Sequence, residues 1–268
     1  MNGNSLSRDA MQRVIQAVLG ESRQVEVLHR GRNRTIFRWR DGDGASLVVK
    51  LWNRPDFKGV VRRCLRIDSA SHEWRSMVRL HRAGLRVPQP LGRCRVPANA
   101  HGFTEAILME DMGSCTYVIE YIKKLIADGD EMRVESADQQ LVDMTAVILA
   151  AGMIDTDHSL LNIVARGDGE LLRLDLEMAR WVGLPRLFWG MYGRMLGRLL
   201  SSYTFAVQPD DQRVRRFAQG LASGLAPPTR AMQVAQRYLD AMLANQRTCS
   251  NIDMRVPNVW GGQDSGPA

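Results

Sequence analysis

The sequence contains only four cysteines, and no two of them form a Cys-x-x-Cys pair. Scattered cysteines fit neither a zinc cluster nor a disulfide framework, so we expect a cytoplasmic protein in a reducing environment. No run of 18 or more uncharged apolar residues occurs, which argues against a transmembrane helix. Asp9 and Arg13 interrupt the stretch where a signal peptide needs its apolar core, so we expect no signal peptide.

Acidic residues are too few to balance the basic ones. The chain has 36 Lys and Arg against 29 Asp and Glu, a net charge of +7 and a pI near 9.6. This excess favours an anionic partner: nucleic acid, an acidic membrane surface or a phosphorylated substrate. At 268 residues and 45% hydrophobic composition, the chain is long enough for one large domain or two small lobes.

The first 112 residues are rich in strand patterns. Helical spacing of apolar residues predicts a leading helix over 7–19, within a segment 1–20. Turns containing Gly and Asp separate three β-rich runs, which predict an antiparallel meander: Val25–Leu28, Thr35–Trp39 and Leu47–Trp52. A helix is predicted over Ser69–Ala83, ended by Gly84, with a later strand pair up to Ala106–Met109.

After Gly113 the pattern becomes mainly helical. Helices are predicted over Cys115–Ala127, Ala137–Ala151 and, in succession, Leu184–Leu243, with a polar connection between the first two. A hairpin is predicted from strands Asn162–Ala165 and Leu171–Leu174, and we expect 246–268 to be a disordered tail. Strands followed by helices predict an α+β, two-lobed protein, with a β-rich N-lobe at 21–112 and a helical C-lobe at 113–245.

Five features that could take part in catalysis follow one another in a fixed order: Lys50 in an apolar strand, Glu73 on the next helix, Ile107–Asp111 at the end of a strand at the lobe junction, Asp157 with Asn162, and Asp175. Phosphoryl transfer uses such a set, because lysine neutralises nucleotide phosphate, a carboxylate holds the lysine, and oxygen ligands bind Mg²⁺. Another carboxylate accepts the proton of the attacking hydroxyl. Taken singly, each feature also has an ordinary structural explanation, such as a snorkelling lysine or a turn.

With these motifs the chain resembles the protein-kinase-like superfamily. The segments AGLRVPQP and LAAGMIDTDHSLLNIV, with the loop Arg30–Arg34, are similar to the bacterial lipopolysaccharide core (Kdo/heptose) kinase group. The resemblance implies a two-lobed protein-kinase-like fold that uses ATP and Mg²⁺. It implies that Lys50 binds the α/β-phosphates, Glu73 orients Lys50, and backbone groups at Glu110–Met112 bind adenine. It further implies that Asp157 is the catalytic base and that Asn162 and Asp175 are metal ligands.

The sequence departs from the superfamily pattern in three places. No GxGxxG occurs; Gly31 is the only glycine of the first loop. We expect Gly31 to contribute to nucleotide binding and its flanking arginines, including Arg32, to contact phosphate directly. Asp155 replaces the usual histidine before Asp157; it is either a supporting hydrogen-bonding group or a simple loop residue, and we favour the loop residue. Asp175-Leu-Glu replaces the DFG motif, which adds Glu177 near the metal site. We expect His158 to be structural or close to substrate rather than a ligand.

The resemblance implies an ATP-dependent phosphotransferase that acts on a sugar hydroxyl of the lipopolysaccharide core, at the inner face of the cell membrane. The positive charge suits such an anionic glycolipid or sugar acceptor. An aminoglycoside-like small molecule, a protein acceptor and a non-catalytic kinase-shaped binding module are the alternatives. Residues 184–206 have an apolar stripe that fits an interfacial helix on anionic lipid or, as we favour, a buried C-lobe helix. No basic patch interleaved with aromatic residues is present, so nucleic acid is disfavoured.

Overall fold

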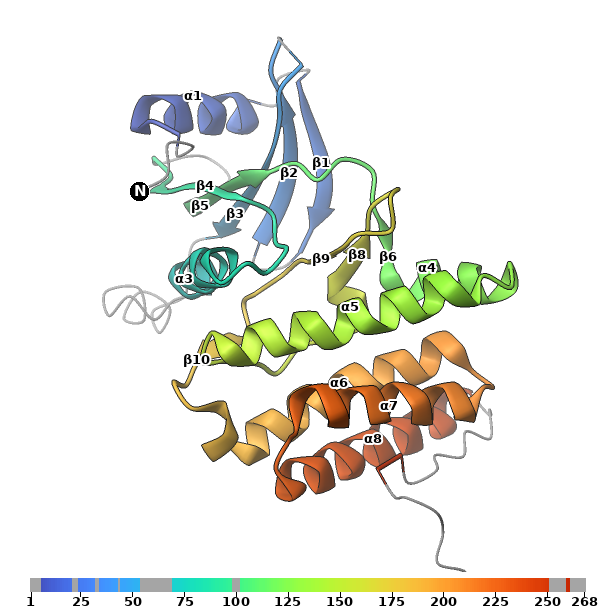
Figure 1. Ribbon diagram of the computed structural model, residues 1–268. Helices are drawn as coiled ribbons and strands as arrows, with labels where there is room; N and C mark the ends of the chain where they lie inside the picture. The colour runs from blue at the N-terminus through green and yellow to red at the C-terminus, as the bar shows by residue number, and fades with distance from the viewer. Residues whose placement is uncertain are drawn as a thin grey trace, which may run out of the picture. The chain divides into compact units, whose positions relative to one another are not determined.

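The computed structural model describes residues 6–20, 24–31, 34–42, 44–53, 69–97, 102–250 and 259–260, without the side chains of 246–250. The chain divides into two compact units. The first comprises the chain up to Arg82 together with Val87–Gly113, and the second comprises Ala83–Arg86 and everything from Ser114. The first unit is built around a sheet and the second is mainly helical (Figure 1). The change of unit at Gly113 lies beside the lobe junction expected near residue 112.

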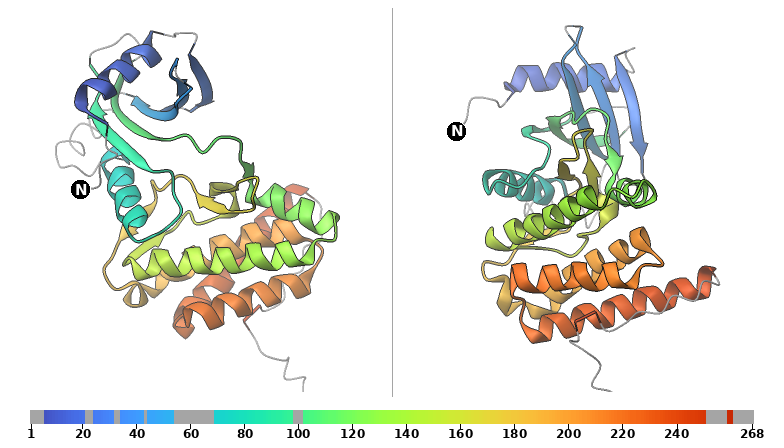
Figure 2. Two further views of the ribbon diagram at one scale, coloured as in Figure 1. Left: turned by 45° about the horizontal axis from the view of Figure 1, so that its top comes forward. Right: turned by 45° about the vertical axis from the view of Figure 1, so that its right-hand side comes forward.

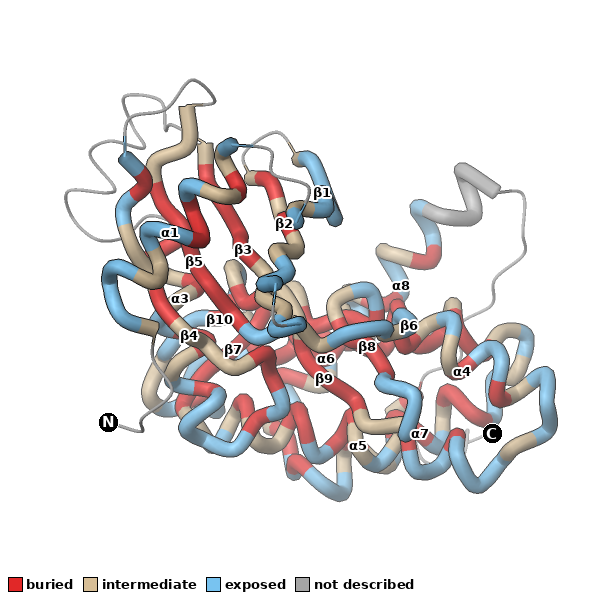
Figure 3. Tube along the Cα trace, turned by 90° about the horizontal axis from the view of Figure 1, so that it is seen from above, coloured by how far each residue is buried: buried red, intermediate tan, exposed pale blue. Residues whose placement is uncertain are grey.

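The first unit contains a five-stranded antiparallel sheet in the order β1-β2-β3-β5-β4. Its strands are β1 (Val25–Arg30), β2 (Arg34–Arg40), β3 (Ser46–Asn53), β4 (Pro90–Arg95) and β5 (Phe103–Glu110). The predicted meander is confirmed, because β1 pairs with β2 and β2 with β3. The two inner strands β3 and β5 are the most deeply buried (Figure 3).

Helices α1 (Arg8–Leu19) and α3 (Ser69–Arg82) both pack on this sheet (Figure 1). The buried face of α1 joins a core that includes Val49 and Leu51 of β3. Since successive side chains of a strand point to opposite faces, Lys50 lies on the other face of β3. It meets Glu73 of α3 there, so the alternation of the strand positions the lysine.

The second unit contains the helices α4 (Val118–Ala127), α5 (Glu131–Ala150), α6 (Trp189–Val207), α7 (Asp211–Leu225) and α8 (Thr229–Ser250). α6 packs against α4, α7 and α8, and α5 packs against α7 (Figure 2). A Cβ atom at Gly193 would lie 2.5 Å from the carbonyl oxygen of Ala231, and one at Gly197 would lie 2.8 Å from that of Ala235. These two glycines therefore allow the close approach of α6 to α8.

Short strands complete the second unit. The predicted hairpin is confirmed as β8 (Ile163–Ala165) and β9 (Leu171–Arg173), with the 3₁₀ turn η1 (Leu160–Asn162) before it and β6 (Thr116–Tyr117) on its edge. A second pair, β7 (Met153–Asp155) with β10 (Ala179–Trp181), was not predicted, because three residues are too few to show an alternation.

Several predicted boundaries are wrong. α5 begins at Glu131 and not at 137, because Asp130 caps it by accepting a hydrogen bond from the N–H of Arg133, so most of the expected polar connection is helical. α4 begins three residues late because Thr116–Tyr117 form β6. α6 begins at Trp189, after the 3₁₀ turn η2 (Pro185–Leu187).

The C-terminal boundary also differs, since α8 continues to Ser250, past the expected start of the tail. Beyond it only Val259 and Trp260 belong to the described residues. Within the described part of the chain, none of the helices combines the length and the apolar character needed to cross a bilayer.

Candidate active site

A buried ion pair joins β3 to α3 in the first unit. Lys50 Nζ lies 2.6 Å from Glu73 Oε1, and the two residues are 3% and 1% exposed. Lys50 Nζ also lies 5.5 Å from the centre of the Trp52 ring, within the range of a cation–π contact. The structure therefore brings together the two residues that the sequence predicts as the phosphate-binding lysine and its partner.

The segment after β5 is fixed by Asp111. This carboxylate accepts hydrogen bonds from Arg38 Nε (2.7 Å), Ser46 Oγ (2.6 Å) and the N–H of Gly113 (3.0 Å). Burial alone would raise the pKa of Asp111, but these hydrogen bonds outweigh burial and hold the pKa below its ordinary value. The N–H of Glu110 donates to the carbonyl of Gln89, and the adenine contact expected of the Glu110 backbone stays a prediction. The contact expected of Met112 stays a prediction.

Gly31 has a structural role in the turn between β1 and β2. Its N–H donates to the carbonyl of Arg34 at 2.9 Å, and a Cβ atom there would lie 3.0 Å from His29 Nε2. The N–H of Gly31 is thus used within the turn, and the phosphate contact expected of Gly31 stays a prediction. Arg32, the other loop residue expected at the phosphates, lies outside the described residues.

Asp157 and Asn162 contact each other directly in the second unit. Asn162 Nδ2 donates to Asp157 Oδ2 at 2.8 Å and to the Asp157 carbonyl at 3.0 Å. On its other side, Asp157 Oδ1 lies 3.3 Å from Arg198 Nη2 of α6. The side chain of Asp157 is 39% exposed, so the predicted base is held by two neighbours and remains accessible to solvent.

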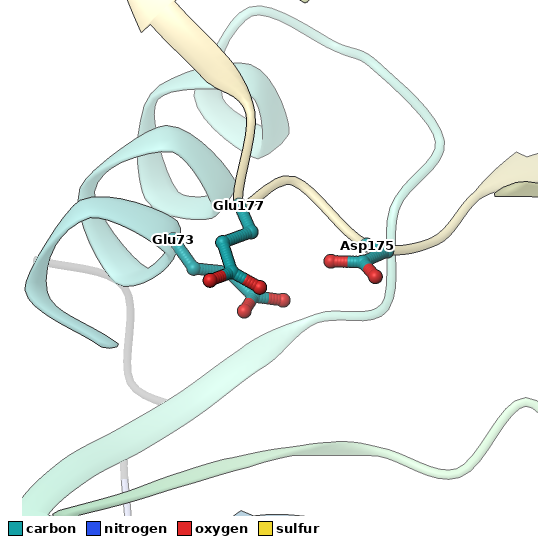
Figure 4. Close-up of side chains that lie close together, drawn as sticks. All are labelled: Glu73, Asp175 and Glu177. Atoms are coloured by element: carbon teal, nitrogen blue, oxygen red, sulfur yellow. The ribbon is translucent and has the colours of Figure 1, made fainter. Parts of the chain in front are cut away.

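The hairpin brings Asn162 next to the chain that leads to Asp175. The N–H of Leu174 donates to the carbonyl of Asn162 at 2.8 Å, and Asp175 then turns the chain with a φ of 40°, a left-handed conformation that Asp tolerates. Carboxylate oxygens of Asp175 and Glu177 lie within 4.8 Å of each other. Figure 4 shows both side chains on the segment after β9, and also Glu73 on α3.

These residues fit a magnesium ion chemically. Mg²⁺ prefers oxygen ligands and binds proteins through one or two carboxylates. Asp175 and Glu177 offer a close carboxylate pair, and Asn162 offers its amide oxygen, since its amide nitrogen is used on Asp157. The expected metal ligands are therefore of the right type, and Glu177 is a further candidate.

Arg173 is a buried cation that bonds to the backbone at or next to Asp157, Asn162 and Asp175. It is 0% exposed, and its Nη2 and Nε lie 2.5 and 3.2 Å from Asp155 Oδ2. It also donates to the carbonyl oxygens of Asn162 and Leu174 (2.7 Å each) and of Asp157 (3.1 Å). Asp155 in turn accepts the N–H of Asp157 at 3.1 Å. Our preferred interpretation of Asp155 as a simple loop residue is wrong; it is the buried counter-ion of this cation.

His158 lies behind the same loop. It is completely buried, and its Nε2 lies 3.0 Å from Thr145 Oγ1 of α5. Burial, with a smaller contribution from the charge of Arg173, lowers the pKa of His158 well below its ordinary value. The neutral, enclosed ring has a structural role, which is one of the two roles expected from the sequence.

Sequence reasoning missed three residues of this arrangement. Arg173 shows the same signal as Lys50, a single cation in an apolar strand, and could have been found by it. Asp111 lies inside a motif that was noted only for its backbone. Arg198 carried no signal, because its contact with Asp157 joins α6 to a loop far away in the sequence.

A sheet unit with a buried Lys–Glu pair and a helical unit with an Asp–Asn–Asp hairpin define the protein-kinase-like fold. A model of the lipopolysaccharide kinase (Kdo/WaaP) family matches residues 41–180, which are 140 of the 268 residues. The chain belongs to this lipopolysaccharide kinase family, and the predicted resemblance and fold class are confirmed. No curated protein sequence is significantly similar to the chain.

Solved structures agree on the fold. The structure of WaaP in complex with acyl carrier protein is similar with a TM-score of 0.60 and 16% identity, over 90% of this chain and 92% of that one. At this identity the likeness shows the fold alone. Two further structures are less similar, and nothing is inferred from them. One is a Toxoplasma gondii rhoptry antigen kinase domain, with a TM-score of 0.48 and 13% identity over 84% of this chain and 82% of that one. The other is WbdD with the inhibitor LY294002, with a TM-score of 0.47 and 16% identity over 79% of this chain and 50% of that one.

Proposed function

We propose that the protein transfers the γ-phosphoryl group of ATP to a sugar hydroxyl of a lipopolysaccharide core. Membership of the lipopolysaccharide kinase family supports a sugar kinase. The observation that carries the proposal is the hairpin, in which Asn162 bonds to Asp157 and its carbonyl accepts the N–H next to Asp175. Phosphoryl transfer needs a base and metal ligands at one place, and this local arrangement supplies both.

In this mechanism the first unit binds the nucleotide. The ammonium group of Lys50 neutralises the α/β-phosphates, and Glu73 orients it through the 2.6 Å contact. The hydrogen bonds to Asp111 keep the Glu110–Met112 backbone in one conformation, with Met112 as an adenine contact. A fixed recognition segment lowers the entropy lost on binding.

The second unit carries out the transfer. Asp157 accepts the proton of the attacking sugar hydroxyl, while Arg198 and Asn162 keep its two carboxylate oxygens in place. Asn162, Asp175 and Glu177 would hold Mg²⁺, and a bound ion would supply positive charge to neutralise the transferring phosphate. Arg173 fixes the backbone of all three loop segments, so the base and the ligands are preorganised.

The test is mass spectrometry of lipopolysaccharide from bacteria that carry the wild-type gene, a deletion or the Asp157→Asn variant. Wild type is expected to add one phosphate group, about 80 Da, that is absent in the deletion and in Asp157→Asn. Asp143→Asn is the matched control, because Asp143 is an exposed carboxylate of α5 that bonds only locally to Gln139 in the described structure. Identical masses in wild type and deletion would contradict this acceptor.

A further inference from the structure

The segment Met178–Trp189 exposes large apolar side chains directly after the metal-binding carboxylates. Trp181, Leu184 and Leu187 are 61%, 66% and 70% exposed. Met178, Phe188 and Trp189 add exposures of 42%, 46% and 41%, and we call these six residues the 178–189 surface. Most of the large exposed apolar side chains of the described residues fall in this one short segment, which is the kind of apolar patch that marks an interaction site.

The backbone of this segment is held in place although its side chains point outward. The N–H groups of Val182 and Gly183 donate to the carbonyl of Gly152 at 2.8 and 3.0 Å, and Ala179 in β10 is completely buried. Pro185 of η2 is also buried. Anchoring residues thus alternate with protruding ones, so the apolar side chains are presented outward by a fixed segment.

The charged residues from 178 to 209 are all basic. Residues 178–209 contain four arginines and no Asp or Glu: Arg180, Arg186, Arg194 and Arg198. Arg180, Arg186 and Arg194 are exposed, whereas Arg198 is turned toward Asp157. The protruding apolar groups are therefore flanked by cations available to an anionic partner.

A hollow continues this surface between α6 and α8. It measures about 540 Å³ and is lined by Trp189, Gly190, Met191, Arg194, Val234 and Arg237. Its size lies in the range of small-molecule sites, about 300–1,000 Å³. Two arginines beside a tryptophan and a methionine suit a group that is anionic at one end and apolar at the other.

The buried part of α6 argues against an interfacial helix that extends over all of residues 184–206. From Tyr192 to Val207 most of its side chains are buried against neighbouring helices, as expected for a C-lobe helix. The exposed apolar residues precede that buried part and include the first residue of α6. The interfacial character of residues 184–206 is thus confined to the part around η2.

We propose that the 178–189 surface docks the protein on an anionic phospholipid bilayer. Trp, Phe and Leu side chains enter the boundary between head groups and acyl chains, and the arginines bind the anionic head groups. Lipid is favoured over an acidic protein because exposed apolar groups and exposed arginines occur together in one short segment, which suits the boundary of head groups and acyl chains, and because Trp is enriched at membrane interfaces. The proposed membrane binding depends on the 178–189 surface alone. Its link to catalysis rests on the proposed function, in which the acceptor is lipid-linked.

The test is co-sedimentation of the full chain with vesicles of phosphatidylcholine alone or with about 30% phosphatidylglycerol, without ATP or acceptor. Wild type is expected to bind the anionic vesicles and to lose binding as salt rises. Leu184→Ser with Leu187→Ser should weaken binding at least about tenfold. Arg180→Gln with Arg186→Gln should weaken it about 25-fold, at about fivefold for each arginine.

Matched controls carry the same number of changes at other exposed sites. Leu28→Ser with Met132→Ser removes two exposed apolar groups, and Arg133→Gln with Arg166→Gln removes two exposed charges; both should bind as wild type does. Any of three results would overturn the proposal. These are equal sedimentation with both kinds of vesicle or with neither, a loss of binding in the control variants as large as in the surface variants, and dimerisation through Leu184 and Leu187 in gel filtration. Phosphorylation of a soluble, delipidated core sugar is measured separately: it should persist in the surface variants, and its absence in wild type would contradict only the proposed function.

Discussion

The two units contain two buried ion pairs of different design. In the first unit, Lys50–Glu73 joins one strand to one helix. In the second unit, Asp155 meets Arg173, whose planar guanidinium presents five N–H donors in a fixed geometry. Arg173 also bonds three backbone carbonyls. The first pair therefore links two elements, while the second is a permanent frame for three loop segments.

This difference suits the proposed division of labour. A lysine that must also bind phosphate needs a partner that can adapt when the nucleotide arrives or leaves. A catalytic loop needs the opposite, because a base and metal ligands are effective only in a fixed geometry. Four measurements, ordered by the size of the expected effect, can break or sharpen the comparison.

The largest effect is expected for Asp155→Ala. It leaves the charge of Arg173 buried and without its carboxylate, so about 3–5 kcal/mol of unfolding free energy should be lost. Urea unfolding measures this loss. Asp168→Ala, at an exposed turn of the same hairpin, should stay within about 0.5 kcal/mol of wild type. Equal stability of the two variants would refute the permanent-frame role.

Asp138 in the second unit adds a third, partly buried carboxylate to the comparison, one that is paired with a hydroxyl and not with a cation. Asp138 accepts a hydrogen bond from Tyr203 at 2.8 Å, and burial raises its pKa to about 6 despite that bond. Because the folded-state pKa lies above the unfolded one, the native state binds a proton more tightly, and this stabilisation is full below about pH 4 and lost as pH rises through about 6. The stability of wild type relative to Asp138→Asn should fall by about 3 kcal/mol between pH 3 and 8. A constant difference across that range in urea unfolding would contradict it.

Breaking the adaptable pair should affect catalysis more than stability. Lys50→Met breaks a link between one strand and one helix, whereas Asp155→Ala disturbs the frame that holds three loop segments, so the loss of unfolding free energy should be smaller than in Asp155→Ala. Loss of the phosphate-binding charge should lower kcat/KM for ATP about 100-fold, or about 2.7 kcal/mol. Steady-state kinetics and urea unfolding of the same preparations give both numbers. A stability loss as large as that of Asp155→Ala would erase the distinction between the pairs.

The smallest effect is expected at Ser46. Ser46→Ala removes one of the hydrogen bonds that hold the pKa of Asp111 down, at a cost of about 1 kcal/mol. Arg38 and the N–H of Gly113 still bond to Asp111, so the KM for ATP should rise only slightly. Thermal unfolding and KM check this. A loss comparable to that of Lys50→Met would mean that Asp111 belongs to the nucleotide site directly.

The sequence predicted the fold class, the sheet meander, the hairpin and the Lys50–Glu73 contact, because each leaves a local trace in apolar periodicity, turn residues or motif order. Short strands such as β7 and β10 left no trace, since their pairing depends on residues far apart in the chain. The same reason hid the Arg173–Asp155 pair and Arg198.

The contacts of Arg173 also affect what can be inferred about the activity of a related protein from its sequence. Its bonds run from a guanidinium to one carboxylate and to main-chain carbonyls, so the side chains of Asp157 and Asn162 can change without disturbing it. An Asp and an Arg 18 residues apart, at the end of one short strand and in another, therefore mark the architecture of this loop and not its activity. A relative that keeps this pair but has lost the carboxylate two residues after the Asp would have the same loop conformation without a base.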